Sequence, residues 1–250
     1  MTLMRNFAQT QARHYVSHRY YEIMRNNSRA RRFPIVMQIR FQRRGFTLVE
    51  LLVVIGIVAL LGALAVPTYQ SAIAHAHAST CASNMHGLGI AFLSYAYDNE
   101  GSLPGRVATG NKWPTLLLPY VGNDVHIFID PGDPVATQIP VTQIVSNSVN
   151  NSSFIFNGFN DLGAYSNPNY VVNLFSVPSS GNLILLGEQK PGGDNFYMDV
   201  NDNDQNNVLN KTAYFGGSNY VFADGSMRHL NATTEYNDNL WLVNQSYVAP

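Results

Sequence analysis

The longest apolar stretch of the chain runs from Phe46 to Val66, and Glu50 is the only charged residue within it. A helix over these 21 residues is ~31 Å long at about 1.5 Å per residue, which matches the hydrocarbon core of a bilayer. The stretch therefore predicts a transmembrane helix. A carboxylate inside such a helix costs about 2–3 kcal/mol on insertion scales, so Glu50 indicates a function that requires it.

Beyond Pro67 the pattern becomes that of an amphipathic helix. Apolar residues recur at spacings of three and four, which places them on one helix face. They are Cys81, Met85, Leu88, Phe92 and Tyr95. The polar segment 98–101, with Pro104 after it, predicts the end of the helix, and Gly101 suits its C′ position. One long helix is therefore expected across residues 46–101.

The second half of the chain is predicted to be rich in β-strands. Short runs of aromatic and β-branched residues are separated by segments of Asn, Gly, Pro and Ser. The runs lie at 153–157, 169–175, 182–187, 220–223 and 226–230. Asp224-Gly225 between the last two runs is a two-residue hairpin signal. This order predicts an α+β fold, in which an antiparallel sheet packs on the C-terminal half of the long helix.

Charge divides the chain into parts with different expected locations. Residues 1–45 contain ten arginines and one acid, Glu22, whereas the rest contains five basic and fifteen acidic residues. Excess positive charge before a transmembrane helix predicts a cytoplasmic N-terminus and an exported remainder. We expect a basic leader at 1–45, a helix at 46–101 that spans the membrane at 46–66, and a β-rich head at 102–250. The acidic head argues against a nucleic-acid partner.

The segment from Gly45 to Glu50 (Gly-Phe-Thr-Leu-Val-Glu) resembles the processing site of type IV prepilins and type II secretion pseudopilins. In this family a basic leader precedes the glycine and an apolar helix follows. The resemblance implies that a membrane peptidase cuts between Gly45 and Phe46 and methylates the new amino group of Phe46. Glu50 is then the fifth residue of the mature chain, and Pro67 lies where pilins commonly kink.

The leader is long for such a protein, whose leaders often have only a handful of residues. Met37 offers a second start site, which leaves a short basic leader from Met37 to Gly45. The start therefore stays open between Met1 and Met37, and residues 1–36 carry no prediction of fold.

The rest of the mature chain resembles a pseudopilin-like family with a so-called H-X9-DG region at its C-terminus. Similar segments occur in the same order, at 78–95, 101–104, 113–120, 128–133, 183–188 and 219–225. Two positions differ: Asp130 stands where the family has a cysteine, and Tyr214 stands where it has a histidine. The head of that family has no settled activity, so this resemblance implies a fold rather than a reaction.

One segment of the head predicts a possible cofactor. Asp202, Asp204 and Asn206 alternate as in the first half of a calcium loop, and their oxygen atoms suit Ca²⁺. The glutamate that closes such loops falls on Ala213, so a solvated acidic loop is the alternative. Calcium binding at these residues is the only cofactor prediction.

Other metal sites are not predicted. The histidines His75 and His77 point in different directions on a helix, and His86 lies ~16 Å from His75 along it. Cys81 is the only cysteine, so no internal disulfide can form.

An enzyme is not expected, because no Gly-x-Ser-x-Gly, His-Glu-x-x-His or phosphate-binding glycine loop is present. Glu188 and Asp224 are the one carboxylate pair with a conceivable role in glycoside hydrolysis. The alternative to a filament subunit is a membrane-anchored adhesin or carbohydrate-binding module. The aromatic residues considered for its binding surface are Trp113, Tyr165, Tyr170 and Trp241. Such a module would leave the prepilin-type site unexplained.

The favoured interpretation is a pseudopilin or pilin-like structural subunit of a type II secretion or type IV pilus-like filament. Its expected partners are the prepilin peptidase and methylase, other pilin or pseudopilin subunits, an inner-membrane assembly platform and membrane lipid. The expected location is the bacterial inner membrane, with the head in the periplasm, and a filament after processing.

Glu50 has a predicted role in assembly. Cleavage creates a positively charged amine on Phe46, and this amine can pair with Glu50 of a neighbouring subunit in apolar surroundings. The apolar contacts around that pair are expected from Leu48, Leu51, Val54 and Val58.

Overall fold

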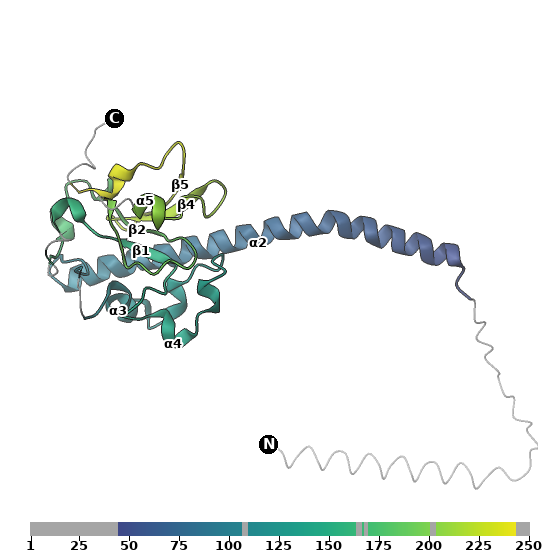
Figure 1. The fold of residues 1–250 in the computed structure, drawn as a ribbon, viewed down its shortest axis with the longest axis horizontal. Helices are drawn as coiled ribbons and strands as arrows, with labels where there is room; N and C mark the ends of the chain where they lie inside the picture. Colours follow the sequence, from purple (N-terminus) through teal and green to yellow (C-terminus); the bar gives the residue numbers. More distant parts are fainter. Residues whose placement is uncertain (1–44, 107–109, 164–166, 168–169, 201–203, 244–250) are drawn as a thin grey trace, which may run out of the picture. The chain divides into compact units, whose positions relative to one another are not determined.

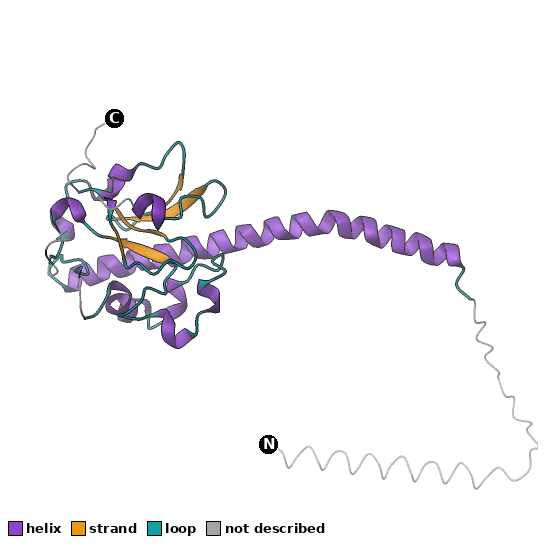
Figure 2. Cartoon of the chain, viewed as in Figure 1, coloured by secondary structure: helices purple, strands orange, loops and turns teal. Residues whose placement is uncertain are grey.

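The computed structural model describes residues 45–106, 110–163, 167, 170–200 and 204–243. The predicted leader therefore lies outside the described residues, apart from Gly45. Two compact units are distinguished, residues 1–55 and residues 56–250. Figures 1 and 2 show a long helix, a sheet and several short helical segments in the described part.

Helix α2 (Leu48–Asp98) continues through Pro67 and confirms the long helix expected from the sequence. Among the described residues it is the one helix that is long and apolar enough to cross a membrane, by length and composition. Its most apolar window of 18 residues has a mean hydropathy of 2.8 and no buried residue. All residues from Leu48 to Val66 are exposed, so the apolar segment has no packing partner within the described chain.

A five-stranded sheet forms the centre of the second unit, in the order β3-β1-β2-β4-β5. The strands are β1 (Phe154–Asn157), β2 (Ile184–Glu188), β3 (Tyr197–Met198), β4 (Gly217–Phe222) and β5 (Met227–Asn231). Neighbouring strands are antiparallel, except that β3 pairs with β1 in parallel. The α+β class is therefore confirmed, and the parallel edge strand β3 was not predicted.

Short helical segments connect these elements. The α-helices are α3 (Trp113–Leu117), α4 (Val141–Ile144) and α5 (Asp204–Asn207). The 3₁₀ segments are η1 (Leu118–Val121), η2 (Val125–Phe128), η3 (Ala136–Gln138), η4 (Asn160–Leu162), η5 (Leu174–Ser176), η6 (Ser180–Asn182) and η8 (Asp238–Trp241).

Four of the five predicted strands are confirmed, as β1, β2, β4 and β5. The run at 169–175 is not a strand in its described part, where only Asn173 forms an isolated bridge, to Ser102. The Asn173 side chain accepts a hydrogen bond from the Phe175 N–H at 2.9 Å and donates one to the Glu100 carbonyl at 3.0 Å. These bonds start a 3₁₀ turn and tie it to the end of α2, so side-chain capping prevailed over strand propensity.

Two predicted turns differ in detail from the structure. The β4–β5 connection has three residues, because Phe222 N–H donates to the Ser226 carbonyl, and Gly225 (φ 82°) takes the left-handed conformation. At the end of α2, Gly101 N–H donates to the Ala96 carbonyl at 2.7 Å, and Glu100 already has a positive φ of 56°. Glu100 rather than Gly101 thus occupies the C′ position.

The sheet has a hydrophobic core on each side. On the α2 side, Phe92 of the helix stacks on Phe156 of β1 at 4.8 Å and on Trp113 at 5.9 Å between ring centroids. The predicted helix face is confirmed, since Cys81, Met85, Leu88 and Phe92 are fully buried and Tyr95 is half-buried. The second core was not predicted, and its members are Ile155, Ile184, Met198, Val208, Leu209, Tyr220, Phe222 and Trp241.

Gly89 explains how closely the helix approaches the sheet. A Cβ atom at this position would lie 3.0 Å from the Gly225 carbonyl oxygen and 3.0 Å from a Val221 methyl group. The helix therefore contacts the β4–β5 hairpin through a bare backbone, and the close packing compensates for the low helix propensity of glycine.

The burial of Phe92 yields a stability prediction. Phe92→Ala removes a fully buried ring from the helix–sheet contact and should lower the free energy of unfolding by about 3–5 kcal/mol. Ile90→Ala is the matched control on the same helix, because Ile90 is 51% exposed. Chemical denaturation of the purified protein measures both. Equal effects of the two substitutions would contradict the packing described.

Candidate functional site

The predicted processing site lies just before helix α2. Gly45 and Phe46 are outside the helix, and Phe46 is 84% exposed. The Gly45–Phe46 bond is therefore in a non-helical, accessible segment, which a peptidase requires. Cleavage at this bond stays a prediction.

Glu50 has a local partner that reasoning from the sequence missed. The N–H and hydroxyl groups of Thr47 donate to Glu50 Oε2, at 2.9 Å and 2.7 Å, and the Glu50 N–H donates to Thr47 Oγ1 at 3.2 Å. This is a capping box, whose Thr-x-x-Glu signature is visible in the sequence. The other carboxylate oxygen, Glu50 Oε1, accepts no hydrogen bond from the described residues. One oxygen of Glu50 thus closes the helix end, and the other remains available.

A buried polar cluster lies between helix α2 and the sheet. The carboxylate of Glu188, at the end of β2, accepts hydrogen bonds from the Cys81 thiol at 3.2 Å and from Asn219 Nδ2 at 2.7 Å. Asp130, from the loop after η2, accepts hydrogen bonds from the Tyr214 hydroxyl and from the Gly132 N–H. Of the residues in this cluster, the sequence pattern predicts burial only for Cys81.

Burial dominates the acid–base behaviour of this cluster. Desolvation raises the pKa of Glu188 to about 7, although hydrogen bonds from Ser218, Cys81 and Asn219 counteract it. Desolvation likewise raises the pKa of Asp130 and of the Cys81 thiol, and the two carboxylates raise the thiol pKa further. The uncharged forms of these side chains are therefore favoured as long as no cation lies among them.

The number of hydrogens available for the bonds of Ser218 also indicates that the Glu188 carboxyl group is protonated. The Ser218 hydroxyl has one hydrogen and contacts two acceptors, Glu188 Oε2 at 2.6 Å and the carbonyl of Asn210. Both contacts are hydrogen bonds only if Glu188 is itself protonated and donates one of them.

The two positions that differ from the H-X9-DG family contact each other. Tyr214, which stands in place of the family's histidine, donates its hydroxyl proton to Asp130, which stands in place of the family's cysteine. A Cβ atom on Gly132 would overlap the same hydroxyl, at 2.3 Å. Tyr214, Asp130 and Gly132 thus meet in one buried contact.

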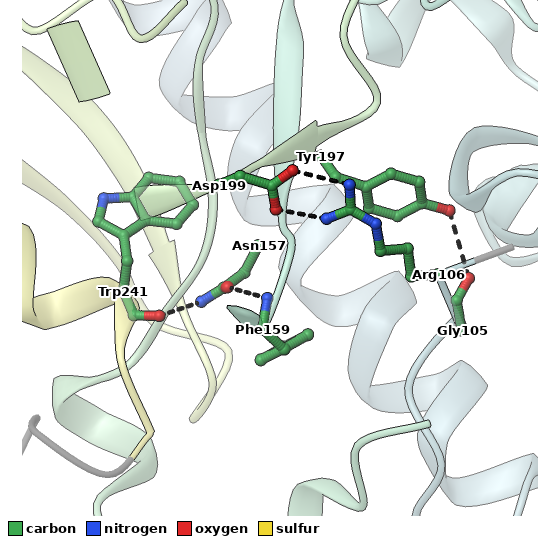
Figure 3. A network of polar contacts seen from close by, with 7 residues as sticks. All are labelled: Gly105, Arg106, Asn157, Phe159, Tyr197, Asp199 and Trp241. Atoms are coloured by element: carbon green, nitrogen blue, oxygen red, sulfur yellow. Dashed lines mark hydrogen bonds and ion pairs between the residues drawn. The ribbon is translucent and has the colours of Figure 1, made fainter. Parts of the chain in front are cut away.

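A second polar network ties the segment after α2 to the end of β3, an edge strand of the sheet (Figure 3). Arg106 forms a two-point ion pair with Asp199, and its guanidinium lies 5.1 Å from the centroid of the Tyr197 ring. In the same view, Asn157 Nδ2 donates to the Trp241 carbonyl at 2.8 Å. The network holds together segments that are distant in the sequence, so its role is structural.

The predicted calcium loop is only partly described. Asp202 lies outside the described residues, and Asp204 opens α5. The Lys190 ammonium donates to the Asn206 carbonyl at 2.6 Å, and the Lys211 ammonium lies 3.4 Å from Asn206 Oδ1. Two positive charges beside Asn206 disfavour a cation there. Calcium binding stays a prediction.

The structure does not support two of the alternatives considered from the sequence. Trp113 and Trp241 are fully buried and do not form an exposed sugar-binding surface; Tyr170 is half-buried, and Tyr165 lies outside the described residues.

Glu188 and Asp224 also do not form a hydrolytic pair. Glu188 is buried beneath α2, whereas Asp224 is exposed in the turn after β4 and bonds to Ser226 and Arg228.

Comparisons with known proteins agree on the amino-terminal region. The prokaryotic N-terminal methylation motif matches residues 40–66. A fimbrial protein of Dichelobacter nodosus is 31% identical over 106 residues, which are 40% of this chain and 66% of that protein. The fimbrial protein EcpC of Eikenella corrodens is 35% identical over 83 residues, 33% of this chain and 54% of that protein.

A fimbrial protein of Neisseria meningitidis serogroup B is 43% identical over 64 residues, 26% of this chain and 37% of that protein. The chain thus spans less than two thirds of the length of these relatives. No solved structure matches the chain.

A methylation motif, a long apolar helix and an α+β head are features that this chain has in common with the pilin class. The motif and the fimbrial relatives support a similarity of its amino-terminal region to the type IV prepilin family. The further similarity to the H-X9-DG family stays a resemblance.

The Arg106–Asp199 pair yields a second stability prediction. Arg106→Ala removes the two-point ion pair with the buried Asp199 carboxylate and should destabilise the protein by about 3 kcal/mol, the low end for a broken buried pair because Arg106 is partly exposed. Arg228→Ala is the control, since its pair with Asp224 is exposed and should cost less than about 1 kcal/mol. Urea denaturation distinguishes them. Similar losses for both variants would show that the network in Figure 3 adds little.

Proposed function

We propose that the chain is the precursor of a filament-forming pilin subunit, non-enzymatic, processed between Gly45 and Phe46. The observation that carries this proposal is the continuous exposed apolar surface of α2 from Leu48 to Val66, with Glu50 as its only charge. A protein in water does not keep such a surface uncovered. Lipid covers it before assembly, and the same segments of neighbouring subunits cover it in the filament.

Glu50 gives the apolar contact a specific register. Removal of the leader leaves a positively charged amine on Phe46. The Thr47 cap occupies one oxygen of Glu50 in its own chain, and Oε1 accepts no hydrogen bond from the described residues. That oxygen accepts the amine of the incoming subunit in an apolar environment, where an unpaired charge is costly.

The processing and assembly partners follow from this proposal. They are a prepilin peptidase and methylase, other pilin or pseudopilin subunits, an inner-membrane assembly platform and membrane lipid. The excess of arginine before residue 46 supports a cytoplasmic N-terminus and a periplasmic head. The names of the fimbrial relatives favour a type IV pilus-like filament over a type II secretion filament.

The first functional prediction concerns processing. The mature protein should begin at Phe46 with a methylated amine, and Gly45→Leu should accumulate as full-length precursor, because the peptidase accepts only a small residue before the cut. Gly45→Ala is the control and should still be cleaved. Mass spectrometry of the membrane fraction identifies the N-terminal residue, its methylation and any uncleaved precursor. A mature N-terminus at any other residue refutes the assignment.

The second concerns Glu50. Glu50→Val should be inserted and cleaved, but its incorporation into filaments should fall by about a hundredfold to several thousandfold, since an unpaired partner of a buried charge costs about 3–5 kcal/mol. Sheared-filament immunoblots measure incorporation against the membrane pool.

Thr47→Ala distinguishes the proposed ion pair of Glu50 with a neighbouring subunit from its role in capping the helix. It removes the cap, worth about 1 kcal/mol, but keeps the carboxylate, so it should assemble nearly as the wild type does. Equal defects in Thr47→Ala and Glu50→Val would mean that Glu50 acts only as a helix cap.

A further inference from the structure

Three potential metal ligands converge in the buried polar cluster beneath helix α2. The Cys81 sulfur and one carboxylate oxygen each from Asp130 and Glu188 all lie within 4.8 Å of one another. The three residues are 0%, 7% and 1% exposed. They come from the helix, from the loop after η2 and from the end of β2, so the tertiary fold alone brings them together.

The cluster contains two buried carboxyl groups, and neither forms an ion pair with another described residue. The ion pairs among the described residues join other groups, namely Arg106–Asp199, Lys211–Asp238 and Arg228–Asp224. The imidazole of His77 lies near enough to Asp130 to lower the pKa of that carboxyl group, against the stronger effect of desolvation. The second carboxylate oxygen of Asp130 accepts no hydrogen bond from the described residues and keeps some contact with solvent. A buried carboxylate without full pairing is costly, and a bound cation removes that cost.

We propose that Cys81, Asp130 and Glu188 bind one Zn²⁺ ion that joins helix α2 to the sheet. One sulfur and two oxygen donors suit zinc, whereas calcium and magnesium take oxygen donors and avoid sulfur. The bond lengths of tetrahedral zinc, about 2.3 Å to sulfur and about 2.0 Å to oxygen, separate the two donors by about 3.5 Å. Cys81 Sγ already lies 3.2 Å from Glu188 Oε1, so the ion takes the place of the thiol hydrogen after a small outward shift.

The surroundings supply the rest of such a site. Asn219 Nδ2, at 2.7 Å from Glu188 Oε1, holds the carboxylate in place as a supporting hydrogen-bond donor. Once Glu188 is deprotonated, the single Ser218 hydrogen goes either to Glu188 Oε2 at 2.6 Å or to the Asn210 carbonyl. The Tyr214 hydroxyl donates a hydrogen bond to Asp130 and supports that carboxylate in the same way. Binding releases the Cys81 proton, and any proton on the carboxyl groups, to solvent. The three ligand anions then exceed the two positive charges of the ion by one negative charge.

The proposal is independent of filament assembly, and the site would be structural. None of its three residues belongs to the exposed apolar segment 48–66, and all three are buried. A zinc ion here would clamp the helix to β2 and to the loop containing Asp130, in a chain that cannot form an internal disulfide.

Cobalt binding by the full-length protein in detergent micelles tests the proposal. Co²⁺ bound by a thiolate gives a charge-transfer band in the near ultraviolet, and Cys81 is the only cysteine in the chain, so any such band reports on Cys81. The expected results are a band that saturates at one Co²⁺ per chain, its displacement by Zn²⁺, and a melting temperature that rises with zinc.

Variants then test the carboxylate ligands. Loss of a supporting contact around a metal typically weakens binding by roughly 10–100-fold. Asp130→Asn and Glu188→Gln each remove a direct ligand and should weaken zinc binding by more than this. Glu100→Gln changes an exposed acid outside the cluster and should leave zinc binding unchanged. Circular dichroism confirms that each variant is folded. Absence of the band in the folded wild type overturns the proposal, as does wild-type zinc affinity in both carboxylate variants.

Discussion

The desolvation of one face of helix α2 against the sheet is the contact on which the rest of the head depends. Between Cys81 and Ala96 this face is buried by β1, β2, β4 and the rings of Trp113 and Phe128. The strands are short, from two to six residues, and gain stability from the helix that covers them. The same helix has no buried residue between Leu48 and Val66. One helix thus packs on the sheet along one part and is exposed along another.

The polar groups beneath that helix are the exception within the apolar contact. Glu188 satisfies its oxygens with a thiol, a hydroxyl and an amide, an arrangement in which each loss leaves a buried group unpaired. Tyr214 and Asp130 depend on each other in the same way. Such a cluster restricts the rotation and sliding of the helix on the sheet more strongly than apolar contacts do, because hydrogen bonds are directional.

Glu50 combines a local and an intermolecular requirement in one side chain. The capping box with Thr47 satisfies backbone groups at the helix start, which matters most where no water is present to do so. In the proposed filament the remaining oxygen pairs with a neighbour. The same carboxylate thereby supports both the helix end and the contact between subunits.

The amino-acid sequence by itself determined the long helix, its apolar segment, the prepilin-type motif and four of the five strands, because these features arise from local periodicity and short motifs. The Thr-x-x-Glu cap was also readable. Only the tertiary structure decided that 170–175 forms a turn, that Trp241 closes a second core, and that Cys81, Asp130 and Glu188 meet. Cys81 and Glu188 are 107 positions apart, and no local pattern encodes a contact whose partners are selected by how helix and sheet pack.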